Sequence, residues 1–225
     1  MYKTETHLHT YPVSACSRLS PEELIRLHKE AGYDTVIISD HFARYHYEKM
    51  EEHLGKKLTW EEYVDVFATG YERAKHAGEQ CGLCVLYAVE LTLGVDHFLL
   101  YGADRSFLML RQDIFDLTAA ELYAHAKAYG VTVIQAHPLR DEKCTPYPDC
   151  VDGFEVFNSH PRHRNHNDEV LELAKQYPHL LRTAGSDVHQ SVDVGGTAVL
   201  SEEPITSVEE YLVLLHSGKA KFLNM

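Results

Sequence analysis

Short apolar runs alternate with helices along nearly the whole chain, and this alternation restricts the fold more than any other feature. Four helix starts carry a capping box, in which Ser or Thr is followed three residues later by Glu. The boxes begin at Ser20, Thr59, Thr118 and Ser207, and Gly32, Gly130 and Gly218 follow three of the helices. The sequence therefore marks the ends of most of its helices.

The apolar runs between these helices have the length and composition of buried strands. We expect strands at Tyr2–Thr6, Thr35–Ser39, Cys84–Val89, Phe98–Tyr101, Val131–Gln135, Gly153–Phe157, Leu181–Ala184, Thr197–Leu200 and Lys221–Leu223. This alternation predicts an α/β fold with a mostly parallel sheet, open or closed into a barrel, and covering helices. No linker or repeat divides residues 1–225, so one domain is expected, with loops or small lids at Arg44–Lys57 and Asp141–Asp152.

The composition disfavours several classes of protein. Of the 225 residues, 44% are hydrophobic and 24% charged, as in ordinary globular proteins. The net charge of −13 opposes binding to the phosphate backbone of a nucleic-acid polymer. No apolar run approaches the roughly 20 residues that span a bilayer, and the first residues lack the apolar core of a signal peptide. We expect a cytoplasmic protein without membrane contact, whose five cysteines are thiols.

Side chains that can bind metal ions stand at the ends of the expected strands or, for Asp96 and His97, at the start of one. They are His7 and His9, Asp40 and His41, Glu90, Asp96 and His97, His137, Asn158, and Asp187 and His189. The carboxyl ends of parallel strands meet at one rim of the sheet, so we expect these side chains to converge there. The other histidines, namely His28, His46, His53, His76, His125, His179 and His216, are expected on helix surfaces or in loops without a functional role.

The types and spacing of these residues indicate a metal centre. In His7-x-His9 both imidazoles lie on one side of an extended segment, because side chains alternate along a strand. Imidazole together with carboxylate suits zinc, manganese or iron. Glu90 has two oxygens and could bridge two ions, and two ions about 3.5–4 Å apart can clamp the attacking and leaving oxygens of a phosphate ester.

The ordered set of motifs resembles the PHP (polymerase and histidinol phosphatase) superfamily. The resemblance rests on His7-x-His9, Ser39-Asp40-His41, Glu90, His97, Gln135-Ala136-His137-Pro138, Glu155-Val156-Phe157-Asn158 and Gly185-Ser186-Asp187-x-His189, and it runs from about His7 to Gly196. It implies a distorted (β/α)7 barrel, two or three divalent ions, and hydrolysis of phosphate esters by metal-activated water.

The resemblance also implies a role for each matching residue. His7, His9, Glu90 and Asp187 would bind one ion; Glu90, His137 and His97 would bind a second; His41 and His189 would bind a third; Asp40 would be a neighbour. Many members of the superfamily have a further His or Asp ligand shortly after the opening pair. Here that segment, Tyr11–Ser17, holds neither residue, and Cys16 or a water could take the position.

The residues expected to act directly in the reaction are His41, Asp187 and His189. If it is not bound to an ion, His41 or His189 could protonate the leaving oxygen. Phosphate binding also favours a fixed cation, for which Arg162, Arg164, Arg140 and Arg18 are the candidates; each could equally be an exposed loop charge. The neighbouring His160, His163 and His166 are expected to contact substrate or solvent.

The sequence favours a phosphatase or phosphoesterase acting on a small substrate, such as histidinol phosphate or a nucleotide. Two alternatives remain. One is an amidohydrolase-type enzyme that cleaves C–N or C–O bonds, a family that characteristically bridges its metals with a carboxylated Lys. The other is a metal-binding PHP-like module without catalytic activity.

Overall fold

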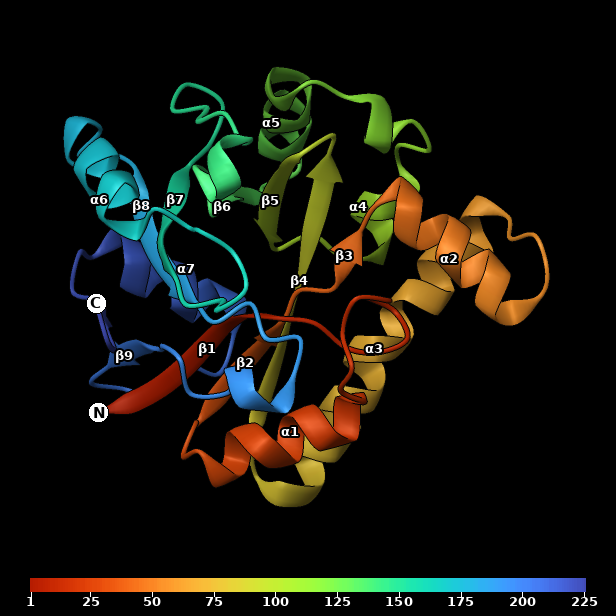
Figure 1. Cartoon of the computed structure of the whole chain (residues 1–225), viewed down its shortest axis with the longest axis horizontal. Coiled ribbons are helices and arrows are strands. Elements are labelled where there is room, and N and C mark those ends of the chain that lie inside the picture. The colour runs from red at the N-terminus through yellow and green to blue at the C-terminus, as the bar shows by residue number, and fades with distance from the viewer.

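The computed structural model describes residues 1–225, and its sheet winds into a nearly closed barrel (Figure 1). The strands are β1 (Tyr2–Leu8), β2 (Thr35–Ile38), β3 (His41–Phe42), β4 (Cys84–Leu93), β5 (Asp96–Tyr101), β6 (Thr132–Ala136), β7 (Gly153–Asn158), β8 (Leu181–Gly185), β9 (Val199–Ser201) and β10 (Lys221–Phe222). Their order is β10-β9-β1-β2-β4-β5-β6-β7-β8, and β3 pairs with β4. A bridge between Leu8 and Val188 brings the end of β1 to the segment after β8.

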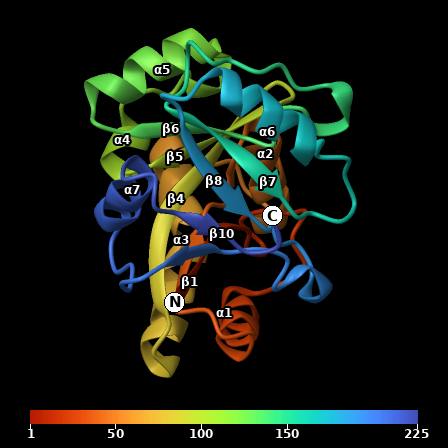
Figure 2. The ribbon, with the colours of Figure 1, turned by 90° about the vertical axis from the view of Figure 1, so that its left-hand side faces the viewer.

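Seven α-helices surround this sheet. They are α1 (Pro21–Glu30), α2 (Arg44–Leu54), α3 (Trp60–Cys81), α4 (Arg105–Met109), α5 (Ala119–Ala128), α6 (Asn167–Gln176) and α7 (Val208–His216), with short 3-10 turns at Ile114–Asp116, Arg140–Glu142 and Ser191–Asp193. In Figure 2 the strands cross the middle of the molecule, with α5 and α6 near one end and α1 at the other. The predicted distorted (β/α)7 barrel is confirmed.

All nine expected strands are present, and the four capping boxes begin helices. Ser20, Thr59, Thr118 and Ser207 each accept a hydrogen bond from the backbone N–H of the Glu three residues later. In α3 and α5 the Glu side chain also accepts from the capping residue, which completes the reciprocal box. Local capping chemistry therefore places these helices correctly from the sequence.

Two strands run against the others in the barrel: β9, which is antiparallel to β1, and β5, which lies beside the site. Strands β1, β2 and β4 are parallel, as are β6, β7 and β8, whereas β5 is antiparallel to both β4 and β6. A reversed strand starts at the rim where its neighbours end. His97, near the start of β5, pairs in register with Thr92 near the end of β4 and with Ala136 at the end of β6.

The segment Arg44–Lys57, expected to be a loop or lid, instead forms helix α2 over Arg44–Leu54. Its start carries no capping signal, because the residue at the N-cap is Ala43, whose side chain cannot accept a hydrogen bond. Its end is marked by Gly55, which adopts the left-handed conformation with φ +65°. The segment Asp141–Asp152 is a loop, as expected, apart from the 3-10 turn at its start.

The helix–sheet core is closed by aromatic side chains below the rim. The Phe42 ring lies 4.8 Å from that of Phe67 and 5.0 Å from that of Tyr63, so β3 is packed firmly against α3. The aromatic packing positions His41, which precedes Phe42 on β3.

None of the helices is both long and apolar enough to cross a bilayer.

Candidate metal centre

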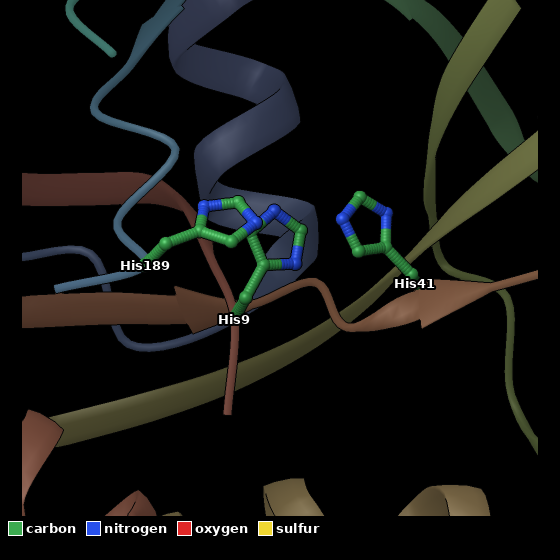
Figure 3. A group of neighbouring side chains, drawn as sticks. All are labelled: His9, His41 and His189. Atoms are coloured by element: carbon green, nitrogen blue, oxygen red, sulfur yellow. The ribbon is translucent and has the colours of Figure 1, made fainter. Parts of the chain in front are cut away.

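All eight predicted metal ligands gather at one rim of the barrel. They are His7 on β1, His9 just after it, His41 on β3, Glu90 on β4, His97 on β5, His137 after β6, and Asp187 and His189 after β8. The groups that could hold an ion include His7, His9 and Asp187, then His7, Glu90 and His137, and then His41, Glu90 and His97. In Figure 3 the His9 ring lies between those of His41 and His189, with centroid separations of 4.1 and 4.5 Å.

Glu90 is fully buried at the middle of the cluster, and its two oxygens face different histidines. Oε1 lies 3.2 Å from His7 Nε2, 3.0 Å from His97 Nδ1 and 3.3 Å from His137 Nε2. Oε2 lies 2.5 Å from His41 Nδ1 and 3.5 Å from His9 Nε2. One carboxylate thus separates two sets of imidazoles, which is the arrangement of a bridging ligand.

Asp187 occupies the other side of His7 and His9. Its Oδ1 lies 2.9 Å from His9 Nε2, 3.7 Å from His7 Nε2 and 3.4 Å from His189 Nδ1. Its Oδ2 accepts a hydrogen bond of 2.6 Å from Arg140. One oxygen therefore faces the histidines, while the other is held by a cation.

The nitrogen and oxygen atoms at the centre are better placed to bind metal ions than to form hydrogen bonds with one another. His7 Nε2, His41 Nδ1 and Glu90 Oε2 are buried and lack a hydrogen-bond partner, although other donors or acceptors lie close by. Buried polar atoms without partners are rare, since each costs about 1–3 kcal/mol. Several such atoms around one space, from imidazoles and a carboxylate, match the coordination preferences of zinc, manganese or iron.

The carboxylates and imidazoles of the cluster perturb one another's protonation. Burial opposes the charge on His7 and His41, but the nearby carboxylates outweigh it and raise the pKa of both well above the usual value, so an ion bound there would displace their protons. Burial alone would raise the pKa of Glu90, but the positive charges of His41, His7 and His97 hold it well below its usual range. Burial is the largest factor that lowers the pKa of His9 and of His137 well below the usual value. The central carboxylate is therefore ionised while these two imidazoles are neutral, and each has a lone pair for a metal.

Two of the candidate metal ligands have a strained backbone. His137 (φ +30°) and Asp187 (φ +53°) directly follow β6 and β8 and lie at positive φ, which side chains other than Gly rarely adopt. Such a conformation costs on the order of 1–3 kcal/mol and persists only where the surrounding structure enforces it. The fold thus turns these two side chains inward at the ends of their strands.

No protein-family model and no curated protein matches this sequence, but solved structures do. A two-domain protein from Bacteroides vulgatus, described as containing a predicted PHP-like metal-dependent phosphoesterase, matches 99% of this chain with a TM-score of 0.66 and 17% identity. The chain has the PHP fold. It spans 64% of the length of the Bacteroides protein. The fold that the motifs implied is therefore confirmed.

Other structures that are similar to this chain carry different names. The lesion-specific endonuclease PfuEndoQ from Pyrococcus furiosus matches with a TM-score of 0.58 and 14% identity, covering 98% of this chain and 57% of its own. An amidohydrolase from Chromobacterium violaceum matches with a TM-score of 0.57 and 13% identity, covering 93% of this chain and 95% of its own. At such identities the likeness shows the fold, and the reaction has to be argued from the site.

Glu155 is a buried carboxylate to which the sequence analysis assigned no role. It holds residues of the candidate metal centre in place by hydrogen bonds. Glu155, on β7, accepts hydrogen bonds from His7 Nδ1 (2.8 Å) on one oxygen, and from His137 N (3.0 Å) and Asn158 Nδ2 (2.9 Å) on the other. A carboxylate on the far nitrogen of a ligand histidine fixes its orientation and tautomer. The available signal was a Glu in the middle of an otherwise apolar strand.

Asp40 is a neighbour of the centre, as the resemblance implied. Its oxygens accept hydrogen bonds from Thr10 N, Thr10 Oγ1 and Ser14 Oγ, each at 2.6 Å. These bonds hold the loop that follows His9. Asp40 therefore shapes the wall of the site through the loop that it holds.

The four candidate arginines lie in different surroundings. Arg140 is mostly buried and reaches the centre through Asp187. Arg162 donates two hydrogen bonds to Asp193, at 2.7 and 2.5 Å, while Arg164 is exposed and pairs with Glu142. Arg18 has an exposed side chain, and its backbone N–H donates to His189 O. Arg140 is thus the candidate with a direct link to the ligands, and phosphate binding by the others stays a prediction.

Two histidines outside the predicted set lie at the centre. His160 Nδ1 lies 2.8 Å from Asp187 O, and the His160 ring lies 5.0 Å from that of His189. His46, expected on a surface, is buried on α2 and stacks on His41 at 4.8 Å. His28, also expected on a surface, is buried elsewhere, on the inner side of α1. His163 is more exposed, pairs with Asp141 and stacks on the His160 ring at 5.0 Å.

Proposed function

We propose that the protein is a metal-dependent phosphoesterase that hydrolyses a small phosphomonoester, such as histidinol phosphate or a nucleotide. One observation carries the proposal: the fully buried Glu90 directs its two oxygens to different sets of histidines. This is the geometry required for two neighbouring divalent ions. We further propose a cytoplasmic location, where the five free thiols would remain reduced.

The ions would supply an activated water near neutral pH and would neutralise the charge that develops on the phosphate. Glu90, His9 and Asp187 would hold the two positions at a fixed separation, and His7 and His137 would be kept in place by Glu155. Because these contacts exist before substrate arrives, little reorganisation is needed during the reaction.

The partly exposed side of the centre is where we place the substrate. His41 and His189 lie there, with side chains 9% and 12% exposed, next to the more deeply buried Glu90 and Asp187. When it is not bound to an ion, either imidazole could donate a proton to the leaving oxygen. Arg140 would stabilise Asp187 as an anion and add positive charge beside the phosphate.

The test is an activity screen on protein stripped with a chelator and reloaded separately with zinc, manganese or iron. The panel contains histidinol phosphate, nucleoside monophosphates, a generic aryl phosphate, a phosphodiester, a single-stranded oligonucleotide, amides and lactones. We expect metal-dependent cleavage of phosphomonoesters. Cleavage of amides or lactones alone would favour the amidohydrolase-type alternative, and cleavage of the oligonucleotide alone would replace the small substrate with a polymer.

Glu90→Gln is the decisive variant for the bridging role. It keeps the shape of the side chain but removes the charge and one acceptor oxygen, so we expect loss of one bound ion and a fall in kcat of at least about a hundredfold. The matched control is Glu172→Gln, on the exposed face of α6, which should behave as the wild type. Metal binding without any hydrolysis across the panel would leave the non-catalytic module as the function.

A further inference from the structure

A cysteine lies among the histidines at the open edge of the centre. The cysteine is Cys16, and the histidines around it are His41, His46 and His189. The ligand atoms of Cys16, His41 and His46 lie within 4.8 Å of one another, and Cys16 Sγ lies 3.1 Å from His189 Nε2. Sulfur beside imidazole nitrogen is a donor set that favours zinc, whereas manganese prefers oxygen ligands.

The loop that carries Cys16 is fixed from inside the barrel. Asp40 accepts the hydrogen bonds of Thr10 and Ser14, and Ser14 Oγ in turn accepts the backbone N–H of His41 at 2.9 Å. These buried bonds join the loop to β3. The sulfur is therefore held beside the His41 ring by a rigid network, even though Cys16 itself is exposed.

In the rings of His189 and His46, the nitrogen that faces away from the sulfur makes a hydrogen bond. This bond indicates whether the other nitrogen can bind a metal ion or can donate a hydrogen bond to the sulfur. His189 Nδ1 lies 2.9 Å from Asp187 O, a carbonyl that can only accept, so Nδ1 carries a proton, and in the neutral ring Nε2 then has a lone pair toward the sulfur. His46 shows the reverse pattern, because its Nδ1 accepts the backbone N–H of Ala15 at 3.1 Å. The proton of His46 is then on Nε2, which can donate a hydrogen bond but cannot bind an ion.

We propose that Cys16 is the thiolate ligand of a third ion, shared with His41 and His189, and that His46 donates a hydrogen bond to the bound sulfur. Ligand atoms around a tetrahedral zinc ion lie about 3.6 Å apart, given Zn–S and Zn–N bonds of about 2.3 and 2.0 Å. The 3.1 Å between Cys16 Sγ and His189 Nε2 needs to open by only about 0.5 Å. The inference rests on the proposed function for its other two ions.

Two consequences separate this site from the pair around Glu90. The third position selects zinc, while the carboxylate-rich positions also accept manganese. An ion bound there also uses the lone pairs of His41 and His189, so these residues no longer serve as proton donors. The activity and its pH dependence are then expected to differ between zinc-loaded and manganese-loaded protein.

The test measures metal binding in the resting protein. Chelator-stripped wild type, Cys16→Ser and the control Cys81→Ser are reloaded with zinc, manganese or cobalt. Cys81 is another exposed free thiol, at the end of α3. Elemental analysis should find one zinc fewer per chain in Cys16→Ser than in the other two proteins, with equal manganese in all three. Cobalt-loaded wild type and Cys81→Ser should show near-ultraviolet thiolate-to-cobalt charge transfer, and Cys16→Ser should lack it.

His46→Phe tests the donor. It should keep the third zinc but shift the charge-transfer band, because the thiolate loses a hydrogen bond; loss of the ion would make His46 a ligand and would overturn that assignment. Absence of the band in wild type, or its persistence in Cys16→Ser, overturns the proposal. If Cys16→Ser does not fold, alkylation of wild-type Cys16 by iodoacetamide decides, because zinc and not manganese should slow it.

These readouts are independent of catalysis. A protein that shows the charge-transfer band but hydrolyses no phosphate ester would retain the cysteine site and lose the proposed function. A Cys16→Ser variant that binds as much zinc as wild type and remains an active phosphatase would exclude the cysteine site and retain the proposed function.

Discussion

Replacing Glu155 with Gln tests whether the carboxylate below the centre controls metal binding. Both oxygens of Glu155 are acceptors: one receives His7 Nδ1, and the other receives His137 N and Asn158 Nδ2. An amide has only one acceptor oxygen. In either orientation of the introduced amide, its NH₂ group would face another donor in a site without exposure to water.

The expected losses of zinc affinity and of folding stability follow from the hydrogen bonds that each oxygen of Glu155 makes. Loss of a carboxylate that orients a ligand histidine typically weakens metal binding or activity by about 10–100-fold, which corresponds to about 1.4–2.7 kcal/mol. If the amide instead points its NH₂ toward His137 N, the unpaired buried donors cost about 1–3 kcal/mol of folding stability. We therefore expect weaker zinc binding together with a lower free energy of unfolding.

Zinc affinity can be measured by competition with a chromophoric chelator, and stability by urea denaturation of the stripped protein. Glu172→Gln serves as the control, because that side chain is exposed and paired only with Lys175. The reasoning is refuted if Glu155→Gln binds zinc as tightly as wild type. A loss of stability without a change in zinc affinity would reduce Glu155 to a structural residue.

Three further predictions concern other parts of the molecule. Arg140→Ala removes the cation on Asp187 and should lower kcat/KM about 10–100-fold, the equivalent of a charge-assisted hydrogen bond, in steady-state assays. Gly70→Ala would place a methyl group 2.5 Å from Asp40 Oδ2 and should cost about 1–3 kcal/mol in urea denaturation. Burial lowers the pKa of His28 from 6.5 to about 4, so the unfolded chain binds the proton more readily, and stability should fall by about 3 kcal/mol as the pH drops from 6.5 to 4. His28→Gln should remove this part of the pH dependence.

Two of these predictions have a matched control variant. Arg26→Ala should leave kcat/KM unchanged, because its guanidinium is exposed on α1 and pairs with Glu30. His216→Gln, on the exposed side of α7, should keep the wild-type slope of stability against pH. An equal effect from either control would contradict the corresponding argument, and unaltered stability of Gly70→Ala would show that the Asp40 loop can move aside.

The convergence of the candidate ligands could be predicted from the sequence because each is adjacent to a strong local signal. His7, His41 and His137 stand at the ends of apolar runs, and parallel strands bring such ends together whatever the details of packing. His97 was placed at the same rim, although the sequence pattern did not reveal that its strand is antiparallel. The short turn at Gly94 and Val95, between β4 and β5, was the available sign of a hairpin.

His46 and Glu155 could not be assigned in the same way, because their roles depend on tertiary packing. His46 lies in a charged segment without an N-terminal capping residue, so neither the helix nor its buried face is evident from the sequence. Glu155 contacts His7, which is 148 residues away in the chain, and strand alternation alone does not identify that partner. Local patterns identified the strands; these contacts depend on how the barrel closes.

The strained conformations of His137 and Asp187 have a consequence for how the protein acquires its metals. Each residue directly follows a paired strand, β6 or β8, and this backbone holds it at positive φ. We therefore expect the two side chains to keep their inward direction after treatment with a chelator, and dialysis against a divalent ion to refill the proposed sites without refolding. Metal content would then follow the composition of the buffer.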